Sequence, residues 1–133
     1  MEIRAAVPED TGAVQRVARR AWHEAHGDII GEEAVEALLE KWYDKPQLAD
    51  AIEREDAPMF VAVDDDVIGF AQGGPSEDGP ADAIVSRIYI LPTYWGEGVG
   101  TTLLQHLFDD LRQAGHDGVW LTVMAENDLA RSF

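Results

Sequence analysis

The sequence predicts an α/β fold of the mixed type, in which a mostly antiparallel sheet is flanked by helices. The expected elements follow the order β-α-α-α-β-β-β-α-β-α, which differs from the steady alternation of strand and helix in a doubly wound fold. Residues 59–63 and 67–71 are short apolar runs on either side of three aspartates, a pattern typical of an antiparallel hairpin. A parallel step is expected only across the helix that follows residues 96–101.

Length and composition favour one domain that spans residues 1–133. The chain has no cysteine, which excludes disulfides, thiolate metal ligands and a cysteine nucleophile, and which agrees with a cytoplasmic location. No apolar run approaches the length of a membrane span, so we expect no membrane partner.

The chain is strongly acidic, with 26 acidic and 10 basic residues and a formal net charge of −16. Such a surface repels nucleic acid and anionic membranes, so neither is expected to bind. It also repels phosphate-bearing ligands at long range, so a phosphate site must act through local dipoles or at a screening ionic strength. Excess acid with scarce lysine resembles the proteins of halophiles, and an ordinary soluble acidic protein is the alternative.

The first part of the chain predicts a strand and a helix. Residues 3–7 form a short apolar run that is expected to be a strand. Pro8 and the two acids after it suit the first turn of a helix, where N–H groups lack partners. Apolar residues then repeat at helical spacing until Gly27, which is expected to end this helix.

Two further helices and a loop are expected next. The second helix follows Gly31 and is broken at Pro46, because proline removes a hydrogen bond and clashes with the preceding turn. A shorter helix continues to about residue 56. Glycine and proline are concentrated in residues 73–80, which predicts a loop.

The strongest functional signal is a glycine-rich turn between a strand and a helix. Residues 84–91 are apolar and rich in β-branched side chains, and Pro92 ends the expected strand. Three glycines follow, which are Gly96, Gly98 and Gly100. Leucines at helical spacing then predict a helix that Gly115 ends. Glycines let a ligand approach the main chain, and the free N–H groups and dipole of the helix's first turn favour phosphate.

The glycine spacing excludes two common phosphate-binding loops. A dinucleotide fingerprint needs a third glycine where this chain has Leu103, and a Walker loop needs a lysine that is absent here. The turn resembles the acetyl-coenzyme A loop of the GCN5-related N-acetyltransferases (GNAT), where a strand and a proline precede Q/R-x-x-G-x-G/A. Gly98 and Gly100 match the two glycines, whereas Trp95 replaces the Gln or Arg. A tight turn without a ligand is the alternative.

The resemblance implies that acetyl-coenzyme A is bound by the turn and by the strand before it. The residues expected to bind this cofactor are Ile88, Tyr89, Ile90, Gly96, Glu97, Gly98, Val99, Gly100, Thr101 and Asn127. Residues 88–90 would pair with the pantetheine arm, which in the family inserts where this strand and the next splay apart. The N–H group of Ile90 would then lie near the thioester carbonyl and stabilise the developing oxyanion.

The end of the chain matches the family a second time. Residues 127–133 resemble the segment N-x-x-A-x-x-F, in which the Asn contacts the pantetheine arm. In relatives, a Tyr that protonates the departing thiolate commonly comes next, and two more strands usually follow. The expectation is therefore a truncated domain that stops at Phe133, before its general acid and C-terminal strands.

The sequence does not identify a single catalytic base. Relatives that acetylate protein N-termini carry a Glu where this chain has Thr122, which cannot act as a base. Glu126, Ser86 and Tyr89 are the candidates. For Glu126 the alternative is a solvated acid at the start of a last helix, which Asn127 would open.

The acceptor side is expected at the first two helices, which form that wall in relatives. Trp22 and His26 would lie at its rim, although Trp22 also continues an apolar stripe that favours a core position. His23 and His26 are three residues apart and have no third ligand, so no metal site is expected. The net charge favours cationic amines as acceptors.

The resemblance thus implies an acetyl-CoA-dependent N-acetyltransferase that moves an acetyl group from the thioester to a primary amine by direct attack. The acceptor would be a small-molecule or peptide amine. One alternative is a non-catalytic module that holds coenzyme A or an acyl-CoA. Another is a structural subunit whose open sheet edge pairs with a second copy to form a homodimer.

Overall fold

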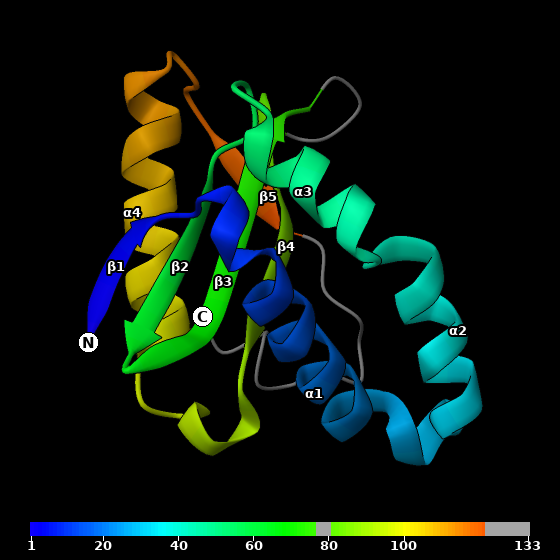
Figure 1. Cartoon of the computed structure of the whole chain (residues 1–133). Coiled ribbons are helices and arrows are strands. Elements are labelled where there is room, and N and C mark those ends of the chain that lie inside the picture. Colours follow the sequence, from blue (N-terminus) through cyan, green and yellow to red (C-terminus); the bar gives the residue numbers. More distant parts are fainter. Residues whose placement is uncertain (77–80, 122–133) are drawn as a thin grey trace.

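A computed structural model describes residues 1–76 and 81–121 of the chain. These residues form a five-stranded sheet in the order β1-β2-β3-β4-β5, with helices on both faces (Figure 1). The strands are β1 (Glu2–Ala5), β2 (Met59–Asp64), β3 (Asp66–Pro75), β4 (Ala83–Ile90) and β5 (Val119–Leu121). Neighbouring strands from β1 to β4 pair antiparallel, and β5 pairs parallel with β4. The predicted mixed sheet, hairpin and parallel step are all confirmed.

Three helices lie on one side of the sheet and a fourth covers the other side (Figure 1). They are α1 (Thr11–Ile30), α2 (Glu32–Trp42), α3 (Lys45–Glu53) and α4 (Val99–Gln113). Phe70 of β3 is fully buried beneath α1 to α3, whereas Leu103 and Leu107 of α4 fill the opposite cluster. The central strand β3 is therefore buried on both faces, as its nearly unbroken apolar sequence requires.

The prediction that the first helix ends at Gly27 is wrong. Gly27 lies inside α1, which continues to Ile30 and ends at Gly31 with φ +89°. A glycine inside a helix costs only about 1 kcal/mol, which packing of the helix against the sheet outweighs. The start is also shifted, because Pro8–Asp10 form a 3₁₀ turn and the α-helix begins at Thr11.

The predicted loop over residues 73–80 is wrong in its first part. Gly73 and Gly74 extend β3 and pair with Val85 and Ile84 of β4. A Cβ atom at position 73 would lie 2.8 Å from the Ile84 carbonyl oxygen and 3.2 Å from a methyl carbon of Leu111. The absence of a side chain at Gly73 thus lets α4 pack closely against the strand. Glycine content alone does not distinguish a glycine needed for close packing from one needed for a turn.

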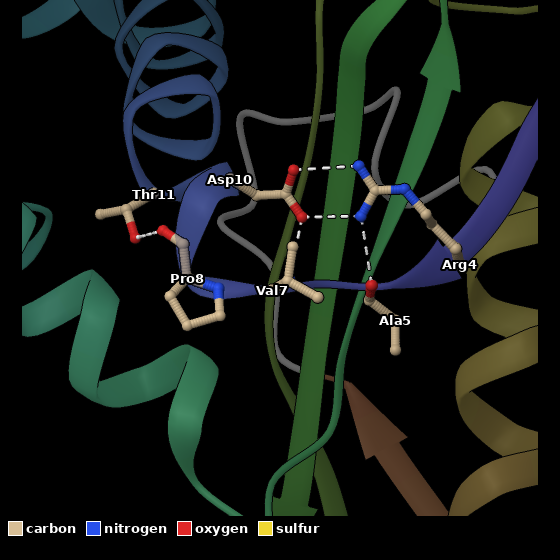
Figure 2. Close-up of polar contacts among 6 residues, drawn as sticks. All are labelled: Arg4, Ala5, Val7, Pro8, Asp10 and Thr11. Carbon is tan, nitrogen blue, oxygen red and sulfur yellow. Dashed lines mark hydrogen bonds and ion pairs between the residues drawn. The ribbon is translucent and has the colours of Figure 1, made fainter.

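An ion pair joins β1 to the start of α1 (Figure 2). The guanidinium of Arg4 donates two hydrogen bonds to the carboxylate of Asp10, at 2.7 and 3.0 Å. The same carboxylate accepts the N–H of Val7 at 2.9 Å, and the Thr11 hydroxyl donates to the Pro8 carbonyl at 2.7 Å. These bonds hold the pKa of Asp10 below its usual value, chiefly through the hydrogen bond from Arg4. They fix the direction in which α1 crosses the sheet.

Several expectations concern residues outside the described part of the chain. Thr122, Glu126, Asn127 and Phe133 belong to this group, as do the predicted last helix and residues 77–80 of the predicted loop. Within the described ranges, no helix is long and apolar enough to span a bilayer.

Candidate functional site

The turn between β4 and α4 forms an open bend on the protein surface. After β4, a 3₁₀ turn at Pro92–Tyr94 leads to Gly96 and Gly98, which have φ values of +82° and +83°. Non-glycine residues rarely adopt this left-handed conformation. A Cβ atom at either position would have no neighbour within 4 Å, so both glycines face open space.

The main-chain N–H groups of this bend are largely unused. Glu97 donates to the Tyr94 carbonyl at 3.4 Å, and Thr102 makes the first helical bond, to the Gly98 carbonyl at 3.1 Å. Within the described ranges, no hydrogen bond takes up the remaining N–H groups, which belong to Gly96, Gly98, Val99, Gly100 and Thr101. Together with the N-terminal dipole of the 15-residue helix α4, these donors form a geometry suited to an anionic phosphate.

The main chain of Ile90 faces away from the rest of the antiparallel sheet. Leu91 donates to the Ile68 carbonyl at 2.8 Å, so the neighbouring pair Gly69 and Ile90 is a non-hydrogen-bonded pair. The Ile90 carbonyl instead accepts the indole N–H of Trp95 at 2.9 Å. Among the described residues nothing accepts the Ile90 N–H, and β4 pairs with β5 only up to Val85. Ile90 thus presents a free donor at this edge.

The main chains of Tyr89 and Ile88 face opposite edges of β4. By the same alternation, the main chain of Tyr89 faces β3, and its side chain lies beneath α1 to α3. The main chain of Ile88 faces outward like that of Ile90.

A cluster of aromatic side chains lies on the α1 to α3 face of β4. The Tyr43 hydroxyl donates to the Tyr89 hydroxyl at 3.0 Å, and the two rings meet edge to face with centroids 5.7 Å apart. Trp22 lies 6.3 Å from the Tyr89 ring and 4.6 Å from the His26 ring. Trp22 and His26 are only 7% and 5% exposed. Trp22 therefore occupies a core position, which was the alternative to a place at the rim of the acceptor side.

Burial raises the pKa of Tyr89 far above its usual range. The phenol therefore keeps its proton at neutral pH and is not suited to act as a base. The Ser86 hydroxyl, the other candidate on this strand, donates to the Gln72 carbonyl at 3.2 Å.

Arg87 is a candidate site residue that the sequence pattern did not indicate. It lies two positions before Tyr89, so both side chains are on the same face of β4. Its guanidinium carbon lies 5.1 Å from the centre of the Tyr43 ring. Its Nη1 atom is buried without a hydrogen-bond partner among the described residues, and so is the Nε1 atom of Trp22. The sequence feature that could have indicated Arg87 is a charged residue at an inward-facing position of a mostly apolar strand.

The two histidines of the first helix do not form a metal site. His23 contacts the carboxylate of Glu36, whereas His26 is buried against Trp22. In the part of the chain that the structure describes, no three His, Asp or Glu side chains are placed to hold a metal ion.

Comparisons with known proteins agree with this geometry. The profile of the Acetyltransferase (GNAT) family matches residues 15–133. Among solved structures, the PaiA N-acetyltransferase from Thermoplasma acidophilum in complex with coenzyme A is similar, with 28% identity and a TM-score of 0.90. The alignment covers 99% of this chain and 84% of that one. A search of curated proteins found no match.

Two more distant structures share the fold. A GNAT family acetyltransferase from Brucella melitensis, in complex with acetyl-CoA, has 23% identity and a TM-score of 0.64, over 96% of this chain and 79% of that one. AAC(6')-Iy in complex with a bisubstrate analogue has 16% identity and a TM-score of 0.71, over 98% of this chain and 84% of that one. The family profile covers most of the sequence. This chain therefore belongs to the GNAT family of acetyltransferases.

Proposed function

We propose that this protein is an acetyl-CoA-dependent N-acetyltransferase that transfers the acetyl group to a primary amine by direct attack. The observation that carries the proposal is the open bend, whose five unused N–H groups lie beside the free donor of Ile90. The similar T. acidophilum structure, which contains coenzyme A, supports the choice of ligand.

The bend fits the diphosphate of coenzyme A. The proposed donors are the N–H groups of Gly96, Gly98, Val99, Gly100 and Thr101. Glu97 belongs to the proposed binding segment through its position, because its own N–H is used by the Tyr94 carbonyl. Asn127 is retained as a proposed contact to the pantetheine arm.

The outward edge of β4 fits the pantetheine arm and the thioester. Ile88 and Ile90 are proposed to bind the arm through their main chains, and Tyr89 supports them from the opposite face of the strand. Acetyl-CoA supplies an acyl thioester, in which the carbonyl carbon is the electrophile. The Ile90 N–H would donate to the carbonyl oxygen as negative charge develops there, and such a donor is worth about 10²–10³ in kcat.

The transfer requires a neutral amine. A lysine-type ammonium group has a pKa of about 10.4, so it must lose a proton before its nitrogen can attack. A bond then forms from this nitrogen to the carbonyl carbon, the bond from that carbon to sulfur breaks, and the thiol of coenzyme A is released. Glu126 is retained as the proposed base.

The α1 to α3 face of β4 is the proposed acceptor side, because α4 covers the other face. Tyr89 would line it, and the buried Tyr43 would hold the Tyr89 hydroxyl through its hydrogen bond. Trp22 and His26 are buried, so we propose that they support these tyrosines from below.

Release of free thiol from acetyl-CoA in the presence of an amine panel tests the proposal. The protein has no cysteine, so the thiol signal reports coenzyme A alone. We expect amine-dependent thiol release together with a mass increase of one acetyl group on the amine. Binding of acetyl-CoA without thiol release would favour the non-catalytic module. If no coenzyme A compound raised the melting temperature, the structural-subunit alternative would be favoured.

A further inference from the structure

Among the described residues, Arg87 is the arginine with a buried side-chain nitrogen that has no hydrogen-bond partner, and it has no acidic partner either. The chain carries 26 acidic residues, yet in the part that the structure describes no carboxylate lies within ion-pair distance of Arg87. Other arginines are paired with Asp or Glu, namely Arg4, Arg19, Arg54 and Arg112. The neighbour that Arg87 does have is the face of the Tyr43 ring.

The lack of an acceptor for the Arg87 guanidinium is unfavourable for the folded state, because part of this group is buried away from water. Among the described residues, the Nη1 atom of Arg87 is buried without a hydrogen-bond partner, and the same is true of the indole N–H of Trp22. The Trp22 and Tyr89 rings are neighbours, with centroids 6.3 Å apart, but the indole N–H makes no hydrogen bond to the phenol. Buried donors without acceptors destabilise a protein, and charged ones do so most. A ligand that brings an acceptor would remove this penalty.

Arg87 lies on the same strand as Ile90, the proposed oxyanion donor. Arg87 and Ile90 are three residues apart on β4, which corresponds to about 10 Å along a strand. The side chain of Arg87 lies over Tyr43, on the face opposite α4 and its bend. It is therefore separated from the proposed diphosphate site and belongs to the acceptor side.

We propose that the acceptor amine also carries a carboxylate, which Arg87 binds, so that the substrate is an amino acid or a related amino carboxylate. The inference rests on the proposed acetyltransferase function and adds the substrate class to it. It reverses the preference for cationic amines expected from the net charge of −16, because Arg87 brings a positive charge to the proposed acceptor side. Arginine suits this role because its planar group donates two parallel hydrogen bonds to a carboxylate.

Pairs of acceptors that differ only in the carboxylate test the proposal. The pairs are β-alanine with propylamine, γ-aminobutyrate with butylamine, and ε-aminocaproate with hexylamine, and they cover the spacing between Arg87 and Ile90. For the best-fitting length, we expect kcat/KM of the amino acid to exceed that of the alkylamine by about tenfold or more. A higher kcat/KM for every alkylamine would overturn the proposal.

Substitutions then assign the preference to Arg87. Arg87→Gln should lower kcat/KM for the amino acid about tenfold and leave the alkylamine unchanged, whereas Arg87→Lys should restore part of the loss. Arg20→Gln is the control, because it removes the same charge from an exposed position on α1. Equal losses for both acceptors in Arg87→Gln would contradict carboxylate binding.

A binding measurement separates this proposal from the activity. The melting temperature is measured with each amino acid of the panel and with its matched alkylamine, in the wild type and in Arg87→Gln. A rise with the amino acid in the wild type alone supports carboxylate binding even if no acceptor is acetylated, in which case only the proposed function fails. No rise with any of the amino acids, together with no difference in kcat/KM, would refute the role of Arg87.

Discussion

The indole N–H of Trp95 donates a hydrogen bond of 2.9 Å to the carbonyl oxygen of Ile90. Trp95 stands where the family motif has Gln or Arg, and in this chain it ties the glycine bend to the last residue of β4. Among the described residues, the N–H of Ile90 has no acceptor at this edge. Trp95 therefore has a structural role beside the proposed reaction centre.

Trp95→Phe should lower kcat more than it changes the KM for acetyl-CoA. The variant keeps an aromatic ring but loses the hydrogen bond, so the Ile90 peptide is less firmly oriented. We expect a loss in kcat of about two- to tenfold, in line with a net bond energy of about 0.5–1.5 kcal/mol. Tyr94→Phe is the control in the same turn, since it removes the exposed bond of Tyr94 to Asp64. Equal effects of the two variants on kcat would contradict the positioning role.

Gly98→Ala should weaken the binding of acetyl-CoA. An alanine there is strained by the φ of +83°, and relief of the strain would shift the main chain that carries the proposed donors. Gly115→Ala is the control, because Gly115 has φ +103° and equally open surroundings but lies beyond the other end of α4. Both variants should lose about 1–2 kcal/mol of stability, measured by urea unfolding.

Calorimetry separates the two glycine variants. The Kd for acetyl-CoA should rise about tenfold or more in Gly98→Ala and stay near the wild-type value in Gly115→Ala. If both variants bound acetyl-CoA as tightly as the wild type, the bend would not be the diphosphate site.

Asp10→Ala should destabilise the fold and flatten its response to acid. Removal of the carboxylate leaves Arg4 and the Val7 N–H without their acceptor, a loss of about 1–3 kcal/mol. The pKa of Asp10 is lowered in the folded state, so its contribution is fully present above the ordinary value of 3.8 and is lost as the pH falls through the folded pKa.

Urea unfolding at several pH values tests this linkage. The difference in unfolding free energy between the wild type and Asp10→Ala should be constant above pH 5 and shrink below about pH 4. Asp110→Asn, at an exposed position of α4, is the control and should follow the wild type. A difference that stayed constant down to pH 2 would exclude the ion pair as its source.

Salt should strengthen the binding of acetyl-CoA, in contrast to most phosphate sites. The net charge of −16 repels the ligand, whereas the proposed contacts are local N–H dipoles. The Debye length falls from about 10 Å at 0.1 M to about 3 Å at 1 M, so repulsion is screened while the contacts remain. Titrations across this range should give a falling Kd, with a smaller change for dephospho-coenzyme A. A rising Kd would indicate that side-chain cations dominate.

The parts of the fold that the sequence predicted are those fixed by local rules. The strand, the proline and the leucine stripe predicted β4 and α4, and the glycines of the predicted turn include Gly96 and Gly98, which have positive φ. The errors arose where tertiary packing decides. Gly27 is tolerated inside a helix that packs on the sheet, and Gly73 makes room for α4 rather than a turn.

The candidate site was predictable in its main-chain part only. Free N–H groups follow from the geometry of a helix start, which the sequence indicates directly. The contact between Tyr43 and Tyr89 joins residues 46 positions apart, and the unpaired state of Arg87 depends on which side chains surround it. Neither relationship leaves a local pattern in the sequence.

Amide spectra of protein labelled with ¹⁵N-glycine test the central claim most directly, because they report the proposed donors themselves. On addition of coenzyme A, the signals of Gly96, Gly98 and Gly100 should shift in a saturable way, while those of Gly31 and Gly115 stay in place. Shifts confined to other glycines, or no shifts at saturating coenzyme A, would contradict the account.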